Sequence, residues 1–445
     1  MKKRLFISIL SICLTASIAA QEKVWTMEDC MQYAVSNSPA VRKKTYEQEI
    51  NKAEYTSAIA NFFPSLDVGA NARYNYGRSI DPETNMYKET TTFNNYYSGE
   101  ANLPLFSGGQ LINQWRSAKL NRQSGMNAIQ KAKDDLALKV MQAYIDVVYY
   151  KGLMRYTSDK LEESRKNLHK SQRLVELGLK GKADLAQIEA EVANDDYLCT
   201  LQQNRYDMAI STLKEYMNYP IGEELEVGTV IIDSAYQPLT ESVDDIYNYA
   251  QENNPTALQA GFDLRNSELK HLIQKGKLFP TIALYAGVNT SYFENLKSDV
   301  APKSFNTQFK NNMGEYFGVS VRIPLFNRLN TVTEVRRARN NVRIAEETQS
   351  EILRQLQTAI EKAVLDREGY AKEITQMEKK LQAEEYSYQV TSRKYEEGLA
   401  SSLDLRTSAN LLLESQANLL HRKLMYLLKC KEVDYYKGVP LVIEN

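Results

Sequence analysis

Two aspartates occupy matching positions in the two halves of the chain. Asp184 and Asp404 each lie six residues after a glycine, Gly178 and Gly398, in the repeated pattern Gly-Leu-x-x-x-x-Asp-Leu. A carboxylate that recurs at the same place in both halves is a candidate functional group. These two residues are therefore the first to consider for a charged site.

Helix capping is the alternative role of the two aspartates. The pair Asp184 and Gln187 has the spacing of a capping box, and so has the pair Ser401 and Asp404. An acid in the first turn of a helix can cap that helix and still face an opening. The spacing is compatible with both roles.

Catalytic chemistry has little support in the sequence. The three histidines, His169, His271 and His421, are far apart and do not recur between the halves. No Cys/His spacing indicates a metal site, and no nucleophile elbow, P-loop or Gly-rich dinucleotide turn occurs. The many Asp/Glu pairs on predicted helices are typical of solvated coiled-coil faces. We therefore expect neither an enzyme nor a cofactor or metal.

Four landmarks occur twice in the same order, which indicates a tandem duplication. Two of them recur with one common spacing: Ser38-Pro39 as Asn254-Pro255, and Phe63-Pro64 as Phe279-Pro280. The other two share a slightly longer spacing: Pro104-Leu105-Phe106 recurs as Pro324-Leu325-Phe326, and Gly178-Leu179 as Gly398-Leu399. A longer loop in the second half explains the change. We divide the chain into a first repeat, residues 21–241, and a second repeat, residues 242–445.

Proline placement predicts very long helices. No proline occurs in residues 105–219 or 325–439, and proline breaks helix interiors. Each of these stretches is interrupted once, near the repeated Gly-Leu. We expect two antiparallel helical hairpins, residues 107–218 and 327–437, whose first helices run about 70 residues, or roughly 100 Å.

Two pairs of amphipathic strands precede the hairpins. Apolar or small residues alternate with polar ones, as expected of strands with one apolar face. The expected strands are 64–77, 93–106, 280–293 and 314–326. Four strands cannot close a pore alone, and their apolar face must be covered.

Aromatic residues indicate what covers that face. They gather at both ends of the strands, like the two interfacial girdles of an outer-membrane barrel. The expected girdle residues are Phe63, Phe106, Phe279 and Phe326 at the helix side, and Tyr74, Tyr76, Tyr96, Tyr97 and Tyr292 at the loop side. The apolar face would then contact lipid. The alternative is a soluble sandwich, which Gly69, Ala70 and Ala72 would fill poorly.

Composition and targeting agree with a secreted protein. Residues 1–20 have a basic start, an apolar middle and small residues before Ala20, the pattern of a signal peptide. The formal charge of −1 becomes −4 without the three basic residues of that peptide, so a nucleic-acid partner is not expected. Three cysteines follow, and a bridge between Cys30 and Cys430 is conceivable but not expected.

Duplicated halves, each with a strand pair and a giant helical hairpin, resemble the TolC-like outer-membrane efflux protein family. The resemblance covers nearly the whole chain after residue 20. It rests on the order and spacing of the Phe-Pro strand starts, the Pro-Leu-Phe strand ends and the Gly-Leu-x-x-x-x-Asp-Leu turns.

The resemblance implies a mainly α fold with membrane β strands. Three chains would form a homotrimer with a twelve-stranded barrel in the outer membrane and a periplasmic tube of helices. A belt around the tube would come from residues 219–241, short helices at 26–36 and 242–252, and the C-terminal tail. The family serves as the passive exit duct of tripartite pumps, so an inner-membrane pump, a periplasmic adaptor and outer-membrane lipid are the implied partners.

The resemblance also gives roles to the hairpin turns. Asp184 and Asp404 would line the periplasmic gate, although the further acid that often follows is Thr407 here, beside Arg406. The exposed tip residues that would contact the adaptor are Gly178, Leu179, Gly398 and Leu399.

The sequence leaves two alternatives to small-molecule efflux. Within the channel class the alternative is type I protein secretion, which the sequence does not separate from efflux because the duct is shared and substrate selection occurs upstream. A different class is a periplasmic coiled-coil scaffold that conducts nothing, against which the aromatic girdles and alternating strands argue.

Overall fold

The computed structural model of the protein describes residues 24–80, 85–229, 239–298 and 301–442. The expected signal peptide, residues 1–20, lies outside the described residues, as does part of the expected belt segment 219–241.

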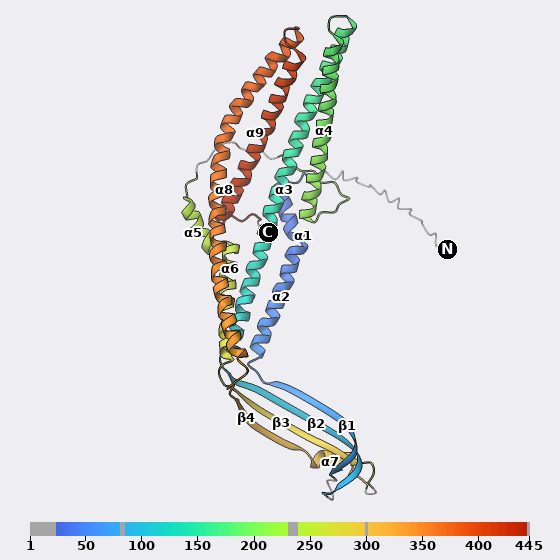
Figure 1. Ribbon diagram of the computed structural model, residues 1–445, viewed down its shortest axis with the longest axis vertical. Helices are drawn as coiled ribbons and strands as arrows, with labels where there is room; N and C mark the ends of the chain where they lie inside the picture. Colours follow the sequence, from blue (N-terminus) through green and yellow to red (C-terminus); the bar gives the residue numbers. More distant parts are fainter. Residues whose placement is uncertain (1–23, 81–84, 230–238, 299–300, 443–445) are drawn as a thin grey trace, which may run out of the picture. The chain divides into compact units, whose positions relative to one another are not determined.

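The order of helices and strands in the second half of the chain repeats that of the first (Figure 1). The elements of the first half are α1 Met27–Asn37, α2 Pro39–Ala60, β1 Ser65–Ile80, β2 Tyr87–Ser107, α3 Gln110–Glu176 and α4 Lys182–Met217. Those of the second half are α5 Val243–Asn253, α6 Pro255–Gly276, β3 Thr281–Asn295, α7 Phe305–Asn311, β4 Gly314–Arg322, α8 Asn330–Glu396 and α9 Ser402–Tyr436. Elements α5, α6 and β3 follow α1, α2 and β1 at one common spacing, whereas α8 and α9 follow α3 and α4 at the slightly longer spacing of the sequence landmarks.

Local chemistry explains where the helices begin and end. Thr26 and Ser242 cap α1 and α5 with full capping boxes. Proline stands at the first position of α2 and of α6, where its missing N–H is not needed. The two longest helices, α3 and α8, have 67 residues each, close to the predicted length, and no proline interrupts them.

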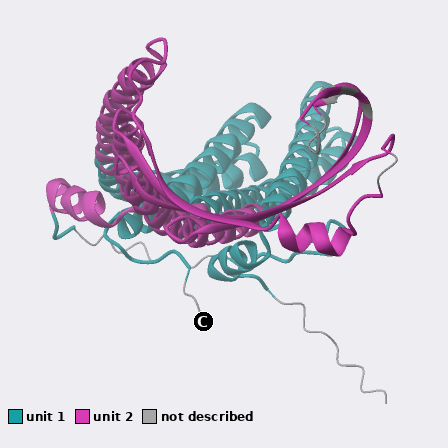
Figure 2. Ribbon diagram, turned by 90° about the horizontal axis from the view of Figure 1, so that it is seen from below, with its two compact units in different colours: residues 1–39, 133–241, 361–445 teal, residues 40–132, 242–360 magenta. Residues whose placement is uncertain are grey.

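The described residues form two compact units, each of which draws on both halves of the sequence (Figure 2). The first unit comprises residues 1–39, 133–241 and 361–445, and the second comprises residues 40–132 and 242–360.

The main core of the first unit lies where α1, α3, α4 and α9 meet the segment after α4. Tyr144 of α3 is 2% exposed, and its hydroxyl lies 3.1 Å and 3.2 Å from the carbonyl oxygens of Trp25 and Gly228. Lys151 donates to the Val227 carbonyl at 2.8 Å. Fully burying a Leu, Met or Ile side chain contributes about 1.5–3 kcal/mol, so this core anchors residues 225–228 to α3.

The second unit contains a single four-stranded antiparallel sheet in the order β1-β2-β3-β4, which curves visibly (Figure 2). Pairing of β2 with β3 joins the two sequence halves in one sheet. A bulge between Pro104 and Phe106 interrupts that register, as expected where proline lacks a donor.

Glycine makes the turn from β2 into α3 possible. Gly108 has a φ of 62°, and a Cβ at this position would lie 2.1 Å from the Gly276 carbonyl oxygen. Nearby, Ser117 of α3 donates to Asn266 of α6 at 2.6 Å, and Gln48 of α2 donates to the Arg122 carbonyl at 2.9 Å. These contacts hold the helices of the second unit together.

Several elements differ from the sequence predictions. Strand β2 begins at Tyr87 instead of residue 93, and β4 ends at Arg322 instead of residue 326. Pro324 prevents β4 from continuing, since it cannot donate to a ladder. Helix α7 lies between the expected strands 280–293 and 314–326, where no helix was predicted, and Ser304 caps its first turn by accepting from the Thr307 amide.

Candidate functional sites

Both long hairpins turn at a glycine in the left-handed conformation. Gly178 has a φ of 73° and Gly398 a φ of 76°. In the first turn the Leu179 amide donates to the Leu174 carbonyl at 2.8 Å, and the Gly178 amide donates to the Val175 carbonyl at 3.0 Å. This pair of bonds is a Schellman motif, and the second turn repeats it. The two glycines therefore have a backbone role, whatever else the tips contact.

The leucines at these turns are uncovered. Leu179 is 70% exposed and Leu399 is 73% exposed, and Leu177 beside the first turn is 71% exposed. Leucines grouped at one tip suggest a partner, since scattered exposed leucines are ordinary but clusters mark interaction surfaces.

Asp404 completes a capping box with Ser401. The Asp404 amide donates to Ser401 Oγ at 3.1 Å, and the Ser401 amide and hydroxyl both donate to Asp404 Oδ2, at 3.0 Å and 2.7 Å. These bonds from the side chain and then the backbone of Ser401 lower the pKa of Asp404. The predicted capping box at this position is confirmed, and the exposed carboxylate stays ionised.

Asp184 has a different environment. Helix α4 is preceded by Gly181, which offers no side-chain cap. The predicted capping box between Asp184 and Gln187 is wrong, because the cap position falls at Gly181 and Asp184 already lies inside the helix. Asp184 is an exposed acid in the first turn, where the helix dipole favours it.

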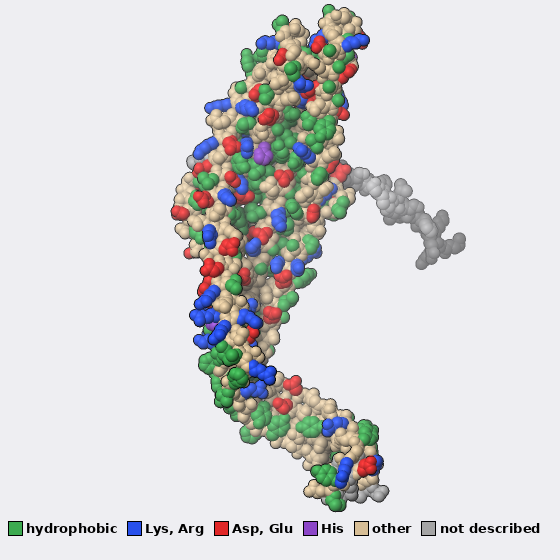
Figure 3. All heavy atoms as spheres, in the orientation of Figure 1, with side chains coloured by type: hydrophobic (Ala, Val, Ile, Leu, Met, Phe, Trp, Pro, Cys, Tyr) green, Lys and Arg blue, Asp and Glu red, His purple; other side chains and the backbone are tan. Residues whose placement is uncertain are grey.

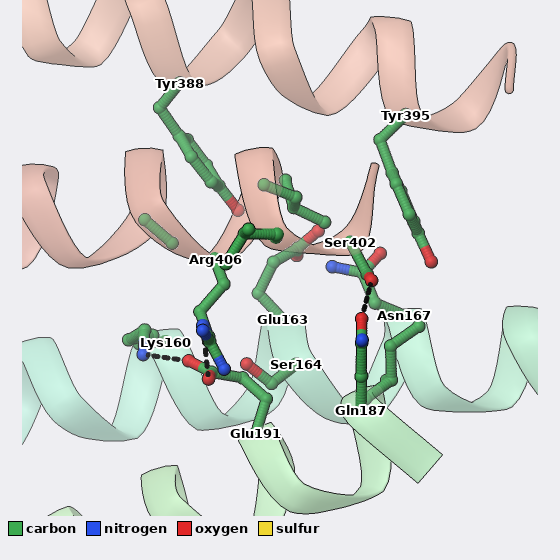
Figure 4. A pocket seen from close by; sticks show the side chains of 14 residues that line it. Lys160, Glu163, Ser164, Asn167, Gln187, Glu191, Tyr388, Tyr395, Ser402 and Arg406 are labelled. Atoms are coloured by element: carbon green, nitrogen blue, oxygen red, sulfur yellow. Dashed lines mark hydrogen bonds and ion pairs between the residues drawn. The ribbon is translucent and has the colours of Figure 1, made fainter. Parts of the chain in front are cut away.

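A cavity of about 160 Å³ lies close to the hairpin turns, lined by side chains of all four hairpin helices (Figure 4). Figure 4 shows Lys160 and Arg406 reaching Glu191 from different hairpins. Arg406 Nε lies 3.7 Å from Glu191 Oε2, and Ser402 Oγ donates to Gln187 Oε1 at 2.8 Å. These two contacts connect α9 to α4.

Glu191 also belongs to a buried ion-pair network with Lys160 and Asp195. Lys160 Nζ lies 2.8 Å from Glu191 and 2.5 Å from Asp195, whose side chain is 1% exposed. Ser164 also donates to Asp195, at 2.5 Å. Burial raises the pKa of Tyr388, on the opposite wall, to about 12. Asp195 is therefore buried with partners, whereas the Arg406 contact is more open to water.

A further pair of contacts joins α3 to α8 nearer the tips. The hydroxyl groups of Ser171 and Tyr395 lie 3.0 Å apart and are buried. Lys170 forms an ion pair with Glu396 at 2.7 Å, and both side chains are about half exposed. The two hairpins thus contact each other at two places along their length. The sequence did not predict these contacts, because each joins residues that are more than 200 positions apart.

The sheet has two chemically distinct faces, and its register assigns each residue to one of them. Ala70 pairs with Tyr97, which pairs with Thr290, so these three lie on the same face. Asn71 pairs with Tyr96 on the other face. Tyr96 and Tyr97 therefore cannot belong to one girdle, although both were predicted to.

Phe93 takes the place on the apolar face that Tyr96 was expected to have. It pairs with Tyr74, and their ring centroids lie 4.6 Å apart. Tyr292 lies on the same face, with its ring 6.3 Å from that of Phe93. Counting by twos from Tyr97 would have found Phe93 in the sequence.

The apolar face is uncovered over most of its area. Leu66, Val68 and Phe317 are 76%, 84% and 86% exposed. The helix-side aromatics are exposed as well: Phe63, Phe106, Phe279 and Phe326. Such a contiguous apolar surface requires a partner or a membrane.

Metal and disulfide chemistry is not apparent in the part of the chain that the structure describes. It contains no cluster of three or more His, Cys, Asp or Glu side chains suited to a metal. No disulfide joins Cys30, Cys199 or Cys430 within those residues.

None of the described helices has a stretch that is both long and apolar enough to cross a membrane.

A tandem-duplicated chain with two helical hairpins of this length and one amphipathic sheet has the fold of the TolC-like channels. The model of the outer membrane efflux protein family matches residues 30–218 and 246–429, and the chain belongs to this family. The resemblance drawn from the sequence is thereby confirmed. The protein is an outer-membrane protein with a periplasmic helical part, and its family consists of channels, not enzymes.

Solved structures agree in fold at low sequence identity. The outer membrane protein VceC of Vibrio cholerae has a TM-score of 0.78 at 15% identity, over 93% of this chain and 96% of that one. The CmeC outer membrane channel of Campylobacter jejuni has a TM-score of 0.78 at 13% identity, over 93% and 85%. The MtrE outer membrane channel of Neisseria gonorrhoeae, in its open state, has a TM-score of 0.74 at 16% identity, over 94% and 89%. No curated protein sequence matches the chain.

Proposed function

We propose that three copies of this chain form the outer-membrane exit duct of a tripartite efflux system. The duct conducts small molecules passively, after an inner-membrane pump and a periplasmic adaptor have delivered them. It contributes a tube, a gate and a membrane seal, and the pump supplies the energy.

The uncovered apolar face of the sheet is the observation that carries this proposal. Figure 3 shows hydrophobic side chains on the surface of the sheet, and the most exposed include Val68 and Phe317. Their transfer to lipid is favourable at about 25 cal/mol per Å². The opposite face carries the polar residues Asp67, Arg73 and Glu100, which suit a water-filled lumen.

Trimerisation would give the two edge strands of the sheet hydrogen-bonding partners. β1 and β4 are the outer strands, and backbone groups at an open edge cannot remain unpaired in hydrocarbon. Three four-stranded sheets supply twelve strands, and pairing β4 of one copy with β1 of the next closes them into a barrel.

The acids at the hairpin tips serve as the periplasmic gate in this proposal. Asp184 and Asp404 from three chains would place up to six carboxylates around the axis, which favour cations and repel one another. The gate closes only if other contacts oppose that repulsion. The contacts of Arg406 with Glu191 and of Ser402 with Gln187 supply such an opposing attraction.

The exposed leucines at the tips are the adaptor contact. Leu179 and Leu399 are held outward by the Schellman turns at Gly178 and Gly398, so an apolar partner helix could cover them without moving the backbone.

The proposed belt around the tube consists of residues 219–241, α1, α5 and the C-terminal tail. Lys437 at the end of α9 forms an ion pair with Glu241 at 2.7 Å, which ties that tail to the belt segment.

Electron microscopy of the mature protein purified in detergent tests the architecture. We expect trimeric needles well over 100 Å long, since each 67-residue helix alone spans roughly 100 Å, with a detergent belt at one end. Compact particles, or thin rods released without detergent, would refute the barrel and favour a periplasmic scaffold.

Substitution of both tip leucines tests the adaptor contact. Leu179→Asp with Leu399→Asp should abolish efflux of toxic compounds by cells and leave the trimer intact on native gels. The matched control is Leu365→Asp, a change at an exposed leucine of α8 that lies far along the helix from the turn. Unchanged resistance in the double variant would contradict the role of the tips.

A further inference from the structure

Helix α7 lies beside the sheet at its loop end (Figure 1). The rings of Phe305 and Phe309 contact Tyr97, with centroids 6.2 Å and 5.7 Å away. Phe305 also contacts Tyr292 at 5.5 Å. Thr290, which shares the row of Tyr97 on this face, donates its hydroxyl to the Phe309 carbonyl at 2.6 Å. The register therefore places α7 over the surface that the proposed barrel turns toward lipid.

Side-chain amides of α7 and of the residue after it hydrogen-bond to the edge of β3 in the stretch that β4 does not reach. Strand β4 begins at Gly314 and pairs with β3 only as far as Asn289. Beyond that point Gln308 accepts from the Phe293 amide at 3.0 Å and donates to the Phe293 carbonyl at 2.9 Å. Asn312 donates to the Ser291 carbonyl at 2.8 Å. On the edge of β3 that lacks β4, side chains thus pair with these backbone groups in place of a strand, as a backbone near a bilayer requires.

The helix has one face for the sheet and another for its surroundings. At 100° per residue, Phe305, Gln308 and Phe309 lie on one side, and the contacts above show that this side meets the sheet. Lys310 projects away from it and is exposed, as is Lys303 just before the helix. The outward surface of α7 is therefore polar and positively charged, unlike the bare sheet below it.

The distance along β3 from the helix side of the sheet to α7 is close to the thickness of a membrane's apolar band. The bare part of β3 runs from Ile282 to the first residue under α7, Thr290. Eight residue steps of about 3.4 Å make roughly 27 Å. A tilt of about 40° reduces this to roughly 21 Å of height, close to the ~25 Å apolar band of an outer-membrane barrel.

We propose that α7 lies in the headgroup layer of the outer leaflet and binds phosphate-bearing anionic lipids through Lys303 and Lys310. Continuity with the apolar face locates it at the membrane surface, and its two lysines complement the negative headgroups. The inference rests on the proposed barrel, because only a sheet embedded in lipid brings α7 to a headgroup.

Tryptophan fluorescence in vesicles tests the depth of α7. The variants are Phe305→Trp on α7, Phe317→Trp on the bare apolar face and Tyr96→Trp on the polar face, each compared with the parent protein. In phosphatidylcholine vesicles brominated near the headgroup or near the chain end, we expect Phe305→Trp to be quenched mainly by shallow bromines. Phe317→Trp should be quenched mainly by deep bromines, and Tyr96→Trp by neither.

Each outcome distinguishes the inference from the proposed function. If Phe317→Trp is not quenched, the barrel itself is refuted. If Phe317→Trp is quenched but Phe305→Trp behaves like Tyr96→Trp, the barrel stands and α7 lies in water. If Phe305→Trp is quenched chiefly by deep bromines, α7 lies in hydrocarbon and the headgroup assignment is wrong.

A second measurement tests the charge. In vesicles where a fifth of the lipid is phosphatidylglycerol, brominated near the headgroup, Phe305→Trp should be quenched more than with the same fraction of brominated phosphatidylcholine. A lysine near an anionic surface corresponds to roughly fivefold enrichment of the anionic lipid. Adding Lys303→Gln and Lys310→Gln should remove the excess, as should about 1 M NaCl, which shortens the Debye length to ~3 Å. The control change Lys182→Gln lies on α4 and should leave it intact. If both brominated lipids quench Phe305→Trp equally while Lys303 and Lys310 are present, the lipid assignment is wrong.

Discussion

Removal of the two contacts between α9 and α4 should open the proposed gate. The double variant Arg406→Gln with Ser402→Ala deletes the Arg406–Glu191 ion pair and the hydrogen bond from Ser402 to Gln187. Neither change disturbs the buried pair of Lys160, so the first hairpin should keep its fold.

The size of the effect follows from geometry and exposure. The ion pair is 3.7 Å long and Arg406 is 45% exposed, so it contributes about 0.5 kcal/mol, in the range of surface pairs. The hydrogen bond is 2.8 Å long but exposed and contributes about 0.5 kcal/mol. Roughly 1 kcal/mol in each of three chains makes about 3 kcal/mol for a trimer, which shifts the balance toward the open state by roughly a hundredfold.

Conductance of purified trimers in planar bilayers measures this shift. We expect the parent protein to be mostly closed and the double variant to conduct steadily. Lys182→Gln removes a positive charge at the turn of the first hairpin without touching either contact, and should remain closed. A double variant that is trimeric and still closed would refute the reasoning, and would indicate that the tie at Ser171 and Tyr395 suffices.

Three more predictions concern the first compact unit. Lys160→Met leaves Asp195 buried without its cation and should lower the free energy of unfolding by about 3–5 kcal/mol, measured by thermal unfolding; adding Asp195→Leu should recover most of the loss. Gly181→Ser should create at α4 the capping box that α9 has, using Asp184, and raise stability by about 0.3–1 kcal/mol in the same assay; a lower midpoint would contradict it. Burial lowers the pKa of His421 from 6.5, so the unfolded chain binds this proton more tightly; stability should be complete above about pH 6.5 and fall as the pH drops from there toward the lowered pKa. His421→Gln should flatten that part of the pH profile, and a profile identical to the parent's would rule out this residue.

Features that depend on local chemistry could be read from the sequence. The absence of proline and the repeated glycines predicted α3 and α8 and the turns at Gly178 and Gly398, because proline and glycine act on the backbone within a few residues. Alternation with period two predicted the strands and their apolar face. The capping box at Ser401 followed from spacing alone. At Asp184 the same reasoning failed, because an alternative cap residue, Gly181, started the helix earlier.

Features that depend on partners far along the chain appear only in the tertiary structure. The register of β1 with β2 separates Tyr96 from Tyr97 and brings Phe93 to the apolar face, since neighbouring strand residues point to opposite sides. The pairing of β2 with β3 joins residues almost 200 apart into one sheet.

The same holds for the contacts that give the proposed sites their character. In the sequence Arg406 is one of many charged residues on a predicted coiled coil. The fold places it beside Glu191 of the other hairpin. Helix α7 lies in a segment expected only to connect two strands, and the contacts of Phe305 and Phe309 with the sheet appear only in the structure. The long helices, the strands, the duplication and the family could be inferred from the sequence, because backbone preferences and periodicity are local properties. The assignment of residues to the apolar or the polar face of the sheet, and the contacts between the hairpins, required the fold, because those neighbours are set by strand register and packing.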